Sequence, residues 1–346
     1  MPKVEEHMPM GNQKTITLVM ATANKMMNEM GVKEAINEQL KWDKAHWGIS
    51  PGGLLKALVI STFTDIRIPL THIQDRLYNV DLTYLLDENA DTQSVNSFNV
   101  GRALERLGET DYNGLYERLA LTALQKYNIP VTNLNSNTTT VSFYGEYDIS
   151  KMNLTEEEQD EIIKIEKGYN KDGRPASKQA VVGQVTTEHG IPLISRTLDG
   201  ATSDVDWNRE ALTYLERLRK EGFNHGIYVA DSKLVTEELV CRMTRKETKV
   251  SFVSRCPANF SNKLEERMIN RAYRNGKWED LGTIGAGKNA SQYRSSSSIE
   301  YHNGSMIRLI VLESSSLKAP AEQSLVEKRS KLTPIIKEIE KKDFAC

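Results

Sequence analysis

One carboxylate in this sequence stands where a metal-dependent reaction would need it. Asp231 directly follows a short apolar stretch, residues 227–230, whose composition is typical of a buried strand. A carboxylate at the end of a strand can ligate Mg²⁺ or Mn²⁺, because both ions prefer oxygen donors. An aspartate in this position can instead cap a helix that follows it. The sequence leaves both interpretations of Asp231 open.

Two stretches carry polar side chains in patterns typical of DNA contact. In the first, residues 94–106, a helix would pack Val95, Phe98 and Leu104 inward and present a polar face outward, as a recognition helix does. The outward side chains that we predict to contact DNA are Asn96, Asn99, Arg102 and Arg106. A merely solvated helix face is the alternative.

The second stretch, residues 255–308, interleaves basic with aromatic side chains. It holds 9 Lys and Arg against 5 Asp and Glu, a local excess of 9 − 5 = +4. Aromatic residues among cations suit phosphate contact and base stacking, and here they are Tyr273, Trp278 and Tyr293. The cations that we predict to contact DNA are Arg255, Arg267, Arg271, Arg274, Lys277 and Arg294. The alternative is again a solvated surface.

Residues 282–289 match the spacing of a phosphate-binding loop except at the last position. Asn289 stands there in place of the Ser or Thr that would ligate Mg²⁺, and no apolar strand precedes the segment. We therefore expect a flexible turn and no nucleotide cofactor. The 6 histidines show no spacing typical of metal ligands.

Length and composition exclude several classes of protein. The 346 residues suggest two domains, at roughly 100–200 residues each. The 45 Lys and Arg against 47 Asp and Glu give a net charge of −2, so a surface that binds nucleic acid must be local. The 3 cysteines contain no C-x-x-C pair and predict neither a disulfide framework nor a zinc knuckle. The polar N-terminus and the lack of long apolar runs predict a cytoplasmic protein without membrane contact.

The hydrophobic pattern divides the chain into four predicted parts. A helical N-terminal, DNA-binding domain spans residues 1–130, and a core of strands and helices spans 131–255. A basic, mostly β insertion follows over 256–312, and 313–346 is the start of a helical C-terminal part.

The core has the element order of a ribonuclease H-like mixed sheet, so the predicted fold class is α/β. The expected strands are residues 138–144, 179–187, 192–198, 227–230 and 250–253, with helices over 206–221 and 236–245. Three antiparallel strands thus precede a helix and a parallel addition. In such a sheet, carboxylates lie on the first strand, at the end of the fourth strand and on a later helix. They hold two divalent ions roughly 3.5–4 Å apart.

Five motifs resemble, in order and spacing, those of DDE transposases from prokaryotic insertion sequences. They lie at residues 141–147, 168–179, 199–204, 230–238 and 252–255. The resemblance covers essentially the whole chain and points to a branch with a helical N-terminal domain of unknown function and a β insertion. It implies DNA cleavage and strand transfer with Mg²⁺ or Mn²⁺, and binding to terminal inverted repeats and target DNA. It also implies homo-oligomers on DNA in a prokaryotic cytoplasm, associated with the nucleoid.

The sequence departs from this family at two of the three ligand positions. The resemblance assigns catalysis and metal binding to residue 137 and Asp231, but residue 137 is Asn137 where the family has an aspartate. Its amide lacks the charge that balances two ions; a loss of roughly 10³-fold in rate would correspond to about 4 kcal/mol. An acid elsewhere that takes over this role is the alternative.

The third carboxylate of the family is a glutamate in a Tyr-x-x-Arg-x-x-x-Glu signature after the insertion. This sequence ends before such a point, so we expect a C-terminally truncated catalytic domain. The possible stand-ins are Glu313, Glu327 and Glu338.

We therefore expect a transposase-family protein that binds the ends of its element and is defective in cleavage. The alternative is a DNA-binding protein without catalysis, such as a domesticated or decayed transposase that represses by occupying those ends.

Overall fold

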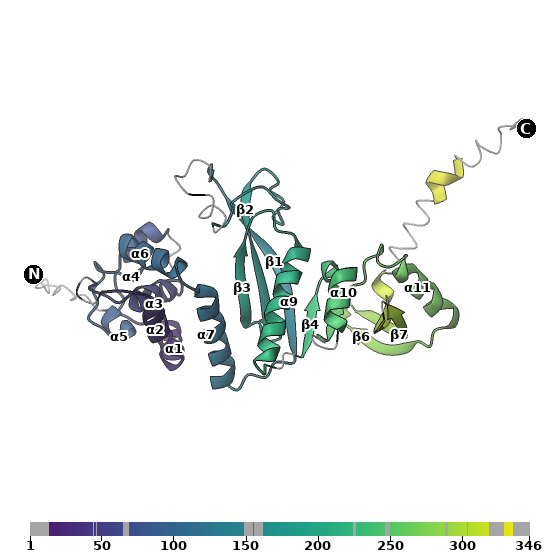
Figure 1. The fold of residues 1–346 in the computed structure, drawn as a ribbon, viewed down its shortest axis with the longest axis horizontal. Helices are drawn as coiled ribbons and strands as arrows, with labels where there is room; N and C mark the ends of the chain where they lie inside the picture. The colour runs from purple at the N-terminus through teal and green to yellow at the C-terminus, as the bar shows by residue number, and fades with distance from the viewer. Residues whose placement is uncertain are drawn as a thin grey trace, which may run out of the picture. The chain divides into compact units, whose positions relative to one another are not determined.

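The computed structural model describes residues 14–43, 45, 47–64, 69–148, 155, 162–223, 226–245, 250–287, 290–302, 304–317 and 329–334 (Figure 1). Two compact units divide the chain. The first is Met1–Trp207 with Gly222–Gly226, and the second is Asn208–Glu221 with Ile227–Cys346. Within the described ranges, no helix is long and apolar enough to cross a membrane. The four-part division of the chain stays a prediction.

The first unit begins with helices, as the hydrophobic periodicity predicts. They are α1 (Leu18–Glu29), α2 (Val32–Gln39), α3 (Pro51–Ser61), α4 (Ile73–Leu77), α5 (Leu82–Leu86), α6 (Ser97–Gly108) and α7 (Tyr112–Lys126), with a 3-10 turn η1 (Leu70–His72). Ser50 caps α3 by accepting a hydrogen bond from the Gly53 amide, and Pro51 follows it. Buried side chains such as Leu54, Ile60 and Leu85 form the core of this helical region.

Three antiparallel strands complete the first unit, in the order β3-β2-β1. They are β1 (Asn133–Phe143), β2 (Lys178–Thr187) and β3 (Pro192–Leu198). The predicted hairpin between the second and third strands is confirmed. Along β1, buried and exposed residues alternate, so Ser136, Thr138 and Thr140 face inward and Asn137 faces outward.

A tryptophan anchors the inward face of these strands. Trp207 is 1% exposed, and its indole nitrogen donates a hydrogen bond to the Ser136 hydroxyl at 2.9 Å. Its ring lies so close to Gly183 that a Cβ there would come within 2.4 Å of it. The strand therefore needs a glycine at this position.

Helix α7 packs against β3 through a buried ion pair. Arg196 of β3 pairs with Glu117 of α7, and both side chains are 5% exposed. The Tyr116 hydroxyl also donates to the carbonyl oxygen of Pro192 at 3.1 Å. These contacts join the helical region to the strands within the first unit.

The second unit contains a parallel pair of strands joined through a helix. Strand β4 (Ile227–Ala230) pairs with β5 (Phe252–Ser254), and α10 (Glu237–Thr244) lies between them in the chain. Helix α9 (Asp204–Lys220) begins in the first unit and continues into the second. The element order and the strand directions are those predicted, and the mixed α/β fold class is confirmed.

The insertion carries a helix that the sequence analysis missed. Strands predominate as predicted: β6 (Glu279–Ile284), β7 (Ser291–His302) and β8 (Ser305–Ser314) form an antiparallel sheet in the order β6-β7-β8. Before them lies α11 (Leu264–Asn275), whose buried residues are Leu264, Met268 and Ala272. These three recur every fourth residue, but the surrounding charge obscures the pattern. Described residues 315–317 and 329–334 are helical.

Candidate functional site

Asn137 lies on the outward face of β1, where solvent reaches it. It is paired across the strands with Gln184, and its side-chain oxygen accepts a hydrogen bond from the Thr138 amide at 2.9 Å. Gln184 in turn donates to the Ser195 hydroxyl of β3 at 3.3 Å. The outward face at this level is therefore a polar row across three strands, with an amide but no carboxylate at position 137.

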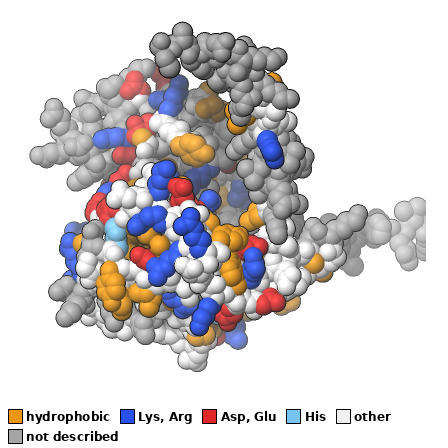
Figure 2. Space-filling model, turned by 90° about the vertical axis from the view of Figure 1, so that its right-hand side faces the viewer, with side chains coloured by type: hydrophobic (Ala, Val, Ile, Leu, Met, Phe, Trp, Pro, Cys, Tyr) orange, Lys and Arg blue, Asp and Glu red, His pale blue; other side chains and the backbone are white. Residues whose placement is uncertain are grey.

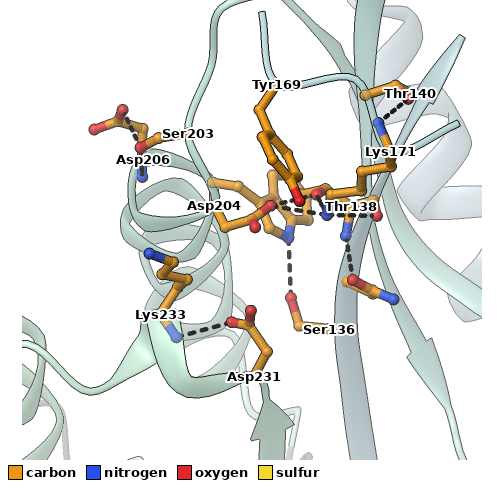
Figure 3. A network of polar contacts seen from close by, with 12 residues as sticks. Ser136, Thr138, Thr140, Tyr169, Lys171, Ser203, Asp204, Asp206, Asp231 and Lys233 are labelled. Carbon is orange, nitrogen blue, oxygen red and sulfur yellow. Dashed lines mark hydrogen bonds and ion pairs between the residues drawn. The ribbon is translucent and has the colours of Figure 1, made fainter. Parts of the chain in front are cut away.

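The inward face of β1 directly behind Asn137 holds a cluster of polar side chains (Figure 3). Lys171 Nζ donates to the carbonyl oxygen of Thr138 at 3.0 Å and to Asp204 Oδ1 at 3.1 Å. The Thr138 hydroxyl donates to the same carboxylate oxygen at 2.5 Å. The Lys171 amide also donates to the Thr140 hydroxyl at 3.2 Å. Two of the five motif segments therefore meet on the strand that carries residue 137.

Other motif residues hold the loops around this strand. Gln179 is fully buried, and its side-chain nitrogen donates to the carbonyl oxygen of Gly200 at 2.7 Å. A Cβ on Gly168 would lie 2.1 Å from that same oxygen. The close approach of the two loops explains why glycine stands at both positions. Sequence reasoning quoted Lys171, Gln179 and Asp204 within motifs but gave them no role; their place in those motifs was the available signal.

Asp231 lies in the second unit, directly after β4. Its Oδ1 accepts a hydrogen bond from the Lys233 amide at 3.0 Å and caps the 3-10 turn η3 (Ser232–Leu234) (Figure 3). The Ser254 hydroxyl donates to its main-chain carbonyl oxygen at 2.6 Å. The capping interpretation is therefore confirmed. The side chain is exposed, and Oδ2 has no hydrogen-bond partner among the described residues.

These donors do not fit a site for two divalent ions. Asn137 and Asp231 together offer one amide and one carboxylate, a charge of −1 against +4 for two such ions. Within the described residues, no three His, Cys, Asp or Glu side chains gather in a group that could hold a metal ion. Glu313, a possible stand-in, pairs with Arg294 and accepts from the Tyr273 hydroxyl. Glu327 and Glu338 lie outside the described residues. No catalytic step through metal ions follows from these side chains.

Helix α6 differs from its predicted packing. Val95 is buried as expected, but Phe98 is 67% exposed and Leu104 is 38% exposed, so the prediction that these two pack inward is wrong. The buried residues of the helix are Val100 and Ala103. Phe98 precedes Val100 by two positions, which places it on another side of the helix.

The four polar residues predicted to contact DNA from α6 differ in availability. Asn96 is the N-cap and accepts from the Asn99 amide at 2.9 Å, while the Asn99 side chain donates to the carbonyl oxygen of Ser94 at 2.9 Å. Arg106 donates to the carbonyl oxygen of Lys41 at 2.6 Å. Arg102 is exposed and lies over the Phe98 ring at 4.5 Å. Arg102 thus keeps its guanidinium accessible, whereas the other three use polar groups locally.

The cations of the insertion form two groups. Arg271 pairs with Glu300 at 2.5 Å, and Arg294 pairs with Glu313 at 2.7 Å. The exposed cations without an ion-pair partner among the described residues are Arg255, Arg267, Arg274 and Lys277. Arg267, Arg271 and Arg274 recur on one side of α11. Figure 2, which faces the part of the chain that contains α11, shows Lys and Arg side chains among hydrophobic ones.

Aromatic side chains lie beside these cations. Trp278 contacts the Tyr273 ring at 5.3 Å between centroids, and the Arg294 guanidinium lies 4.5 Å from the centre of the Trp278 ring. The hydrogen bond to Glu313 raises the pKa of Tyr273. The interleaving of cations and rings predicted from the sequence is thus present in space.

The segment that resembles a phosphate-binding loop joins two strands. Gly282 and Thr283 belong to β6, and β7, which pairs antiparallel with β6, begins at Ser291. A phosphate-binding loop connects a strand to a helix, so this context does not match it. Lys288 and Asn289 lie outside the described residues.

The fold and these groups define a mixed α/β protein with a helical N-terminal region, an amide on its first strand and an exposed basic helix in its insertion. A family model described as a domain of unknown function (DUF4277) matches residues 14–121, which belong to the helical region. No curated protein is significantly similar to the chain.

Solved structures of transposases resemble the chain distantly. One is a cryo-EM structure of the piggyBac transposase synaptic complex with hairpin DNA, at 11% identity and a TM-score of 0.36. The match covers 84% of this chain and 60% of that chain, so this chain spans less than two thirds of its length. Another is the Mos1 transposase paired-end complex with the left transposon end, at 13% identity and a TM-score of 0.22, covering 67% and 68%. Both TM-scores are low, and neither alignment defines the function of this chain.

Proposed function

We propose that this chain is a transposase-type protein that binds the DNA ends of a mobile element and does not cleave them. The observation that carries the proposal is the assembly of motif residues Lys171 and Asp204 on β1, at the strand position where Asn137 replaces the expected aspartate. Residues 33 positions apart in the chain meet at the strand that bears the position of the first catalytic ligand. The arrangement thus retains the support of a catalytic strand without its carboxylate.

DNA binding is supported by the exposed cations of the second unit. Arg267 and Arg274 on α11, with Lys277 directly after it, have no acidic partner among the described residues. Cations that are not neutralised within the protein can displace counterions from phosphates, and this release drives binding. Tyr273 and Trp278 offer ring surfaces beside them.

The absence of cleavage rests on charge. Two-metal cleavage needs carboxylates that hold both ions close together, and the transition state carries additional negative charge that those ions stabilise. The donor set given by Asn137 and Asp231 is too weakly charged for this role. We expect binding that does not depend on a divalent ion.

The test uses the full chain and duplexes taken from the DNA that flanks its gene, with scrambled duplexes as controls. We expect selective binding that weakens steeply with salt, and no nicking in Mg²⁺ or Mn²⁺. Replacing both Arg274 and Lys277 by alanine should lower the slope of log K against log salt by about 2, at about 0.9 per lost phosphate contact. Arg271→Ala, which removes a cation already paired with Glu300, should lower it less. Nicking by the unmodified chain, or equal affinity for all duplexes, would contradict the proposal.

A second candidate is a repressor that occupies the same ends. The observation that favours it is that the unpaired cations, Arg267, Arg274 and Lys277, need no metal ion to engage phosphate. A reporter gene driven from the flanking DNA separates the candidates. Repression that Arg274→Ala with Lys277→Ala relieves supports this second function, whereas unchanged expression leaves end binding without regulation.

A further inference from the structure

The three-stranded sheet of the insertion has two different faces. The inner face carries the even-numbered residues of β7 and the odd-numbered residues of β8, and it packs against α11. Ser298 contacts Met268 there at 3.4 Å, Arg271 pairs with Glu300, and the Tyr273 hydroxyl donates to Glu313 at 2.7 Å. Helix α11 therefore covers this face of the sheet.

The outer face is apolar and exposed. The register pairs Tyr301 with Met306 and places Ile299, Ile310 and Leu312 on the same side. Ile284 of β6, which pairs with Ser291, lies on this side as well. The exposed fractions of these six side chains are Ile284 63%, Ile299 59%, Tyr301 78%, Met306 63%, Ile310 57% and Leu312 56%. An exposed apolar patch that is contiguous on one sheet face marks an interaction surface.

The charges on the outer face argue against DNA as its occupant. Arg308 and Glu279 are the ionised side chains on this side of the described strands, one of each sign. A face without net charge offers little to phosphates. Two identical copies of it, however, can meet without net repulsion.

The area of the face is enough for a weak contact between two copies. With about 3.4 Å per residue and about 4.8 Å between strands, the three strands present a footprint of roughly 400 Å². Two copies would contribute about 800 Å² of footprint, at the low end of specific interfaces. Such a contact forms at high protein concentration or when another interaction brings the copies together. Two sheets that stack in this way lie about 10 Å apart, with their apolar faces interdigitated.

We propose that the outer face of the β6-β7-β8 sheet is a self-association surface that packs against the same face of a second copy of this chain. The contact is independent of DNA and of the cations on α11. It hides the six apolar side chains that the single chain leaves in water.

The test is sedimentation equilibrium of the full chain without DNA over a range of concentrations. We expect a dimer whose fraction rises with concentration and does not fall at high salt. Ile310→Lys should abolish it, because two like charges would meet in an apolar contact, and the thermal melting curve should stay unchanged since the side chain is exposed. Ile269→Lys is the matched control: Ile269 is 38% exposed on α11 and lies outside the outer face. This variant should dimerise like the unmodified chain.

Two further measurements keep the test decisive. Tyr301→Lys changes the most exposed of the six residues and should also give a monomer, even if Ile310→Lys fails to fold. An equimolar mixture of Ile310→Lys and Ile310→Asp chains should recover the dimer, because opposite charges then meet. A chain that stays monomeric at every concentration, or variants that dimerise unchanged, would overturn the proposal. Those outcomes would leave end binding by the cations of α11 unaffected.

Discussion

Lys171 Nζ lies 3.1 Å from Asp204 Oδ1, and the Thr138 hydroxyl lies between them in the same network. The side chains of Lys171 and Asp204 are 30% and 28% exposed, so the pair is mostly withdrawn from water. Because the lysine also contacts the carbonyl oxygen of Thr138, the pair fixes β1 next to Asn137.

Replacing Lys171 by alanine should destabilise the protein. The change leaves the Asp204 carboxylate partly buried with only the Thr138 hydroxyl, and we expect a loss of about 1–2 kcal/mol, less than for a fully buried pair. Urea unfolding measures the effect. Lys167→Ala is the control, since Lys167 is exposed and has no ion-pair partner among the described residues. Equal stability of both variants would show that the pair does not support β1.

The buried pair of Arg196 and Glu117 should be costly to break. With both side chains 5% exposed, Glu117→Leu leaves the guanidinium in the interior without its carboxylate partner. We expect a loss of about 3–5 kcal/mol in the free energy of unfolding. The double variant Glu117→Leu with Arg196→Met removes both charges and should recover most of that loss. A double variant as unstable as the single one would show that the pair itself stabilises the fold.

Glu188 should make stability depend on pH in the acid range. The hydroxyl and amide of Thr132 and the amide of Asn133 donate to its carboxylate and lower its pKa from 4.5 to about 2. A lowered pKa in the folded state stabilises the protein above pH 4.5, and this contribution is lost as the pH falls toward about 2. Melting temperatures of the unmodified chain and Glu188→Gln should differ at neutral pH and converge at low pH. A constant difference across that range would contradict the assignment.

Asn137→Asp should not restore cleavage. The change adds one carboxylate on the exposed face of β1, but two divalent ions still lack a sufficient set of ligands. We expect no product when flanking duplexes are incubated with this variant in Mg²⁺ or Mn²⁺, and normal binding in the same samples. Nicking by the variant would mean that the chain holds its remaining ligands elsewhere.

Asn96 and Arg102 should have separable effects. Asn96→Ala removes the N-cap of α6 and should cost about 1 kcal/mol in stability with little direct effect on DNA affinity. Arg102→Ala removes an exposed guanidinium that contacts the Phe98 ring and should weaken DNA binding at constant stability. Melting curves and binding isotherms of both variants check this. DNA affinity unchanged by Arg102→Ala would remove α6 from the proposed interface.

Local sequence patterns predicted much of the fold because local forces decide it. The strand over residues 227–230 and the cap at Ser50 depend on neighbouring residues, and the structure has both where they were predicted. The motif order also predicted three antiparallel strands before a helix. In contrast, α11 escaped notice because its three buried residues are spread among charged ones.

Only the tertiary structure decided which side chains act together. Lys171 and Asp204 are 33 residues apart, and nothing in their local sequence states that both contact Thr138. Likewise, Phe98 was expected in the core by its apolar character, yet Val100 and Ala103 occupy the buried side of α6. The sequence by itself determined the chemical type at each position, including the amide at residue 137. Packing determined the partners, because burial and long-range contacts depend on residues that are distant along the chain.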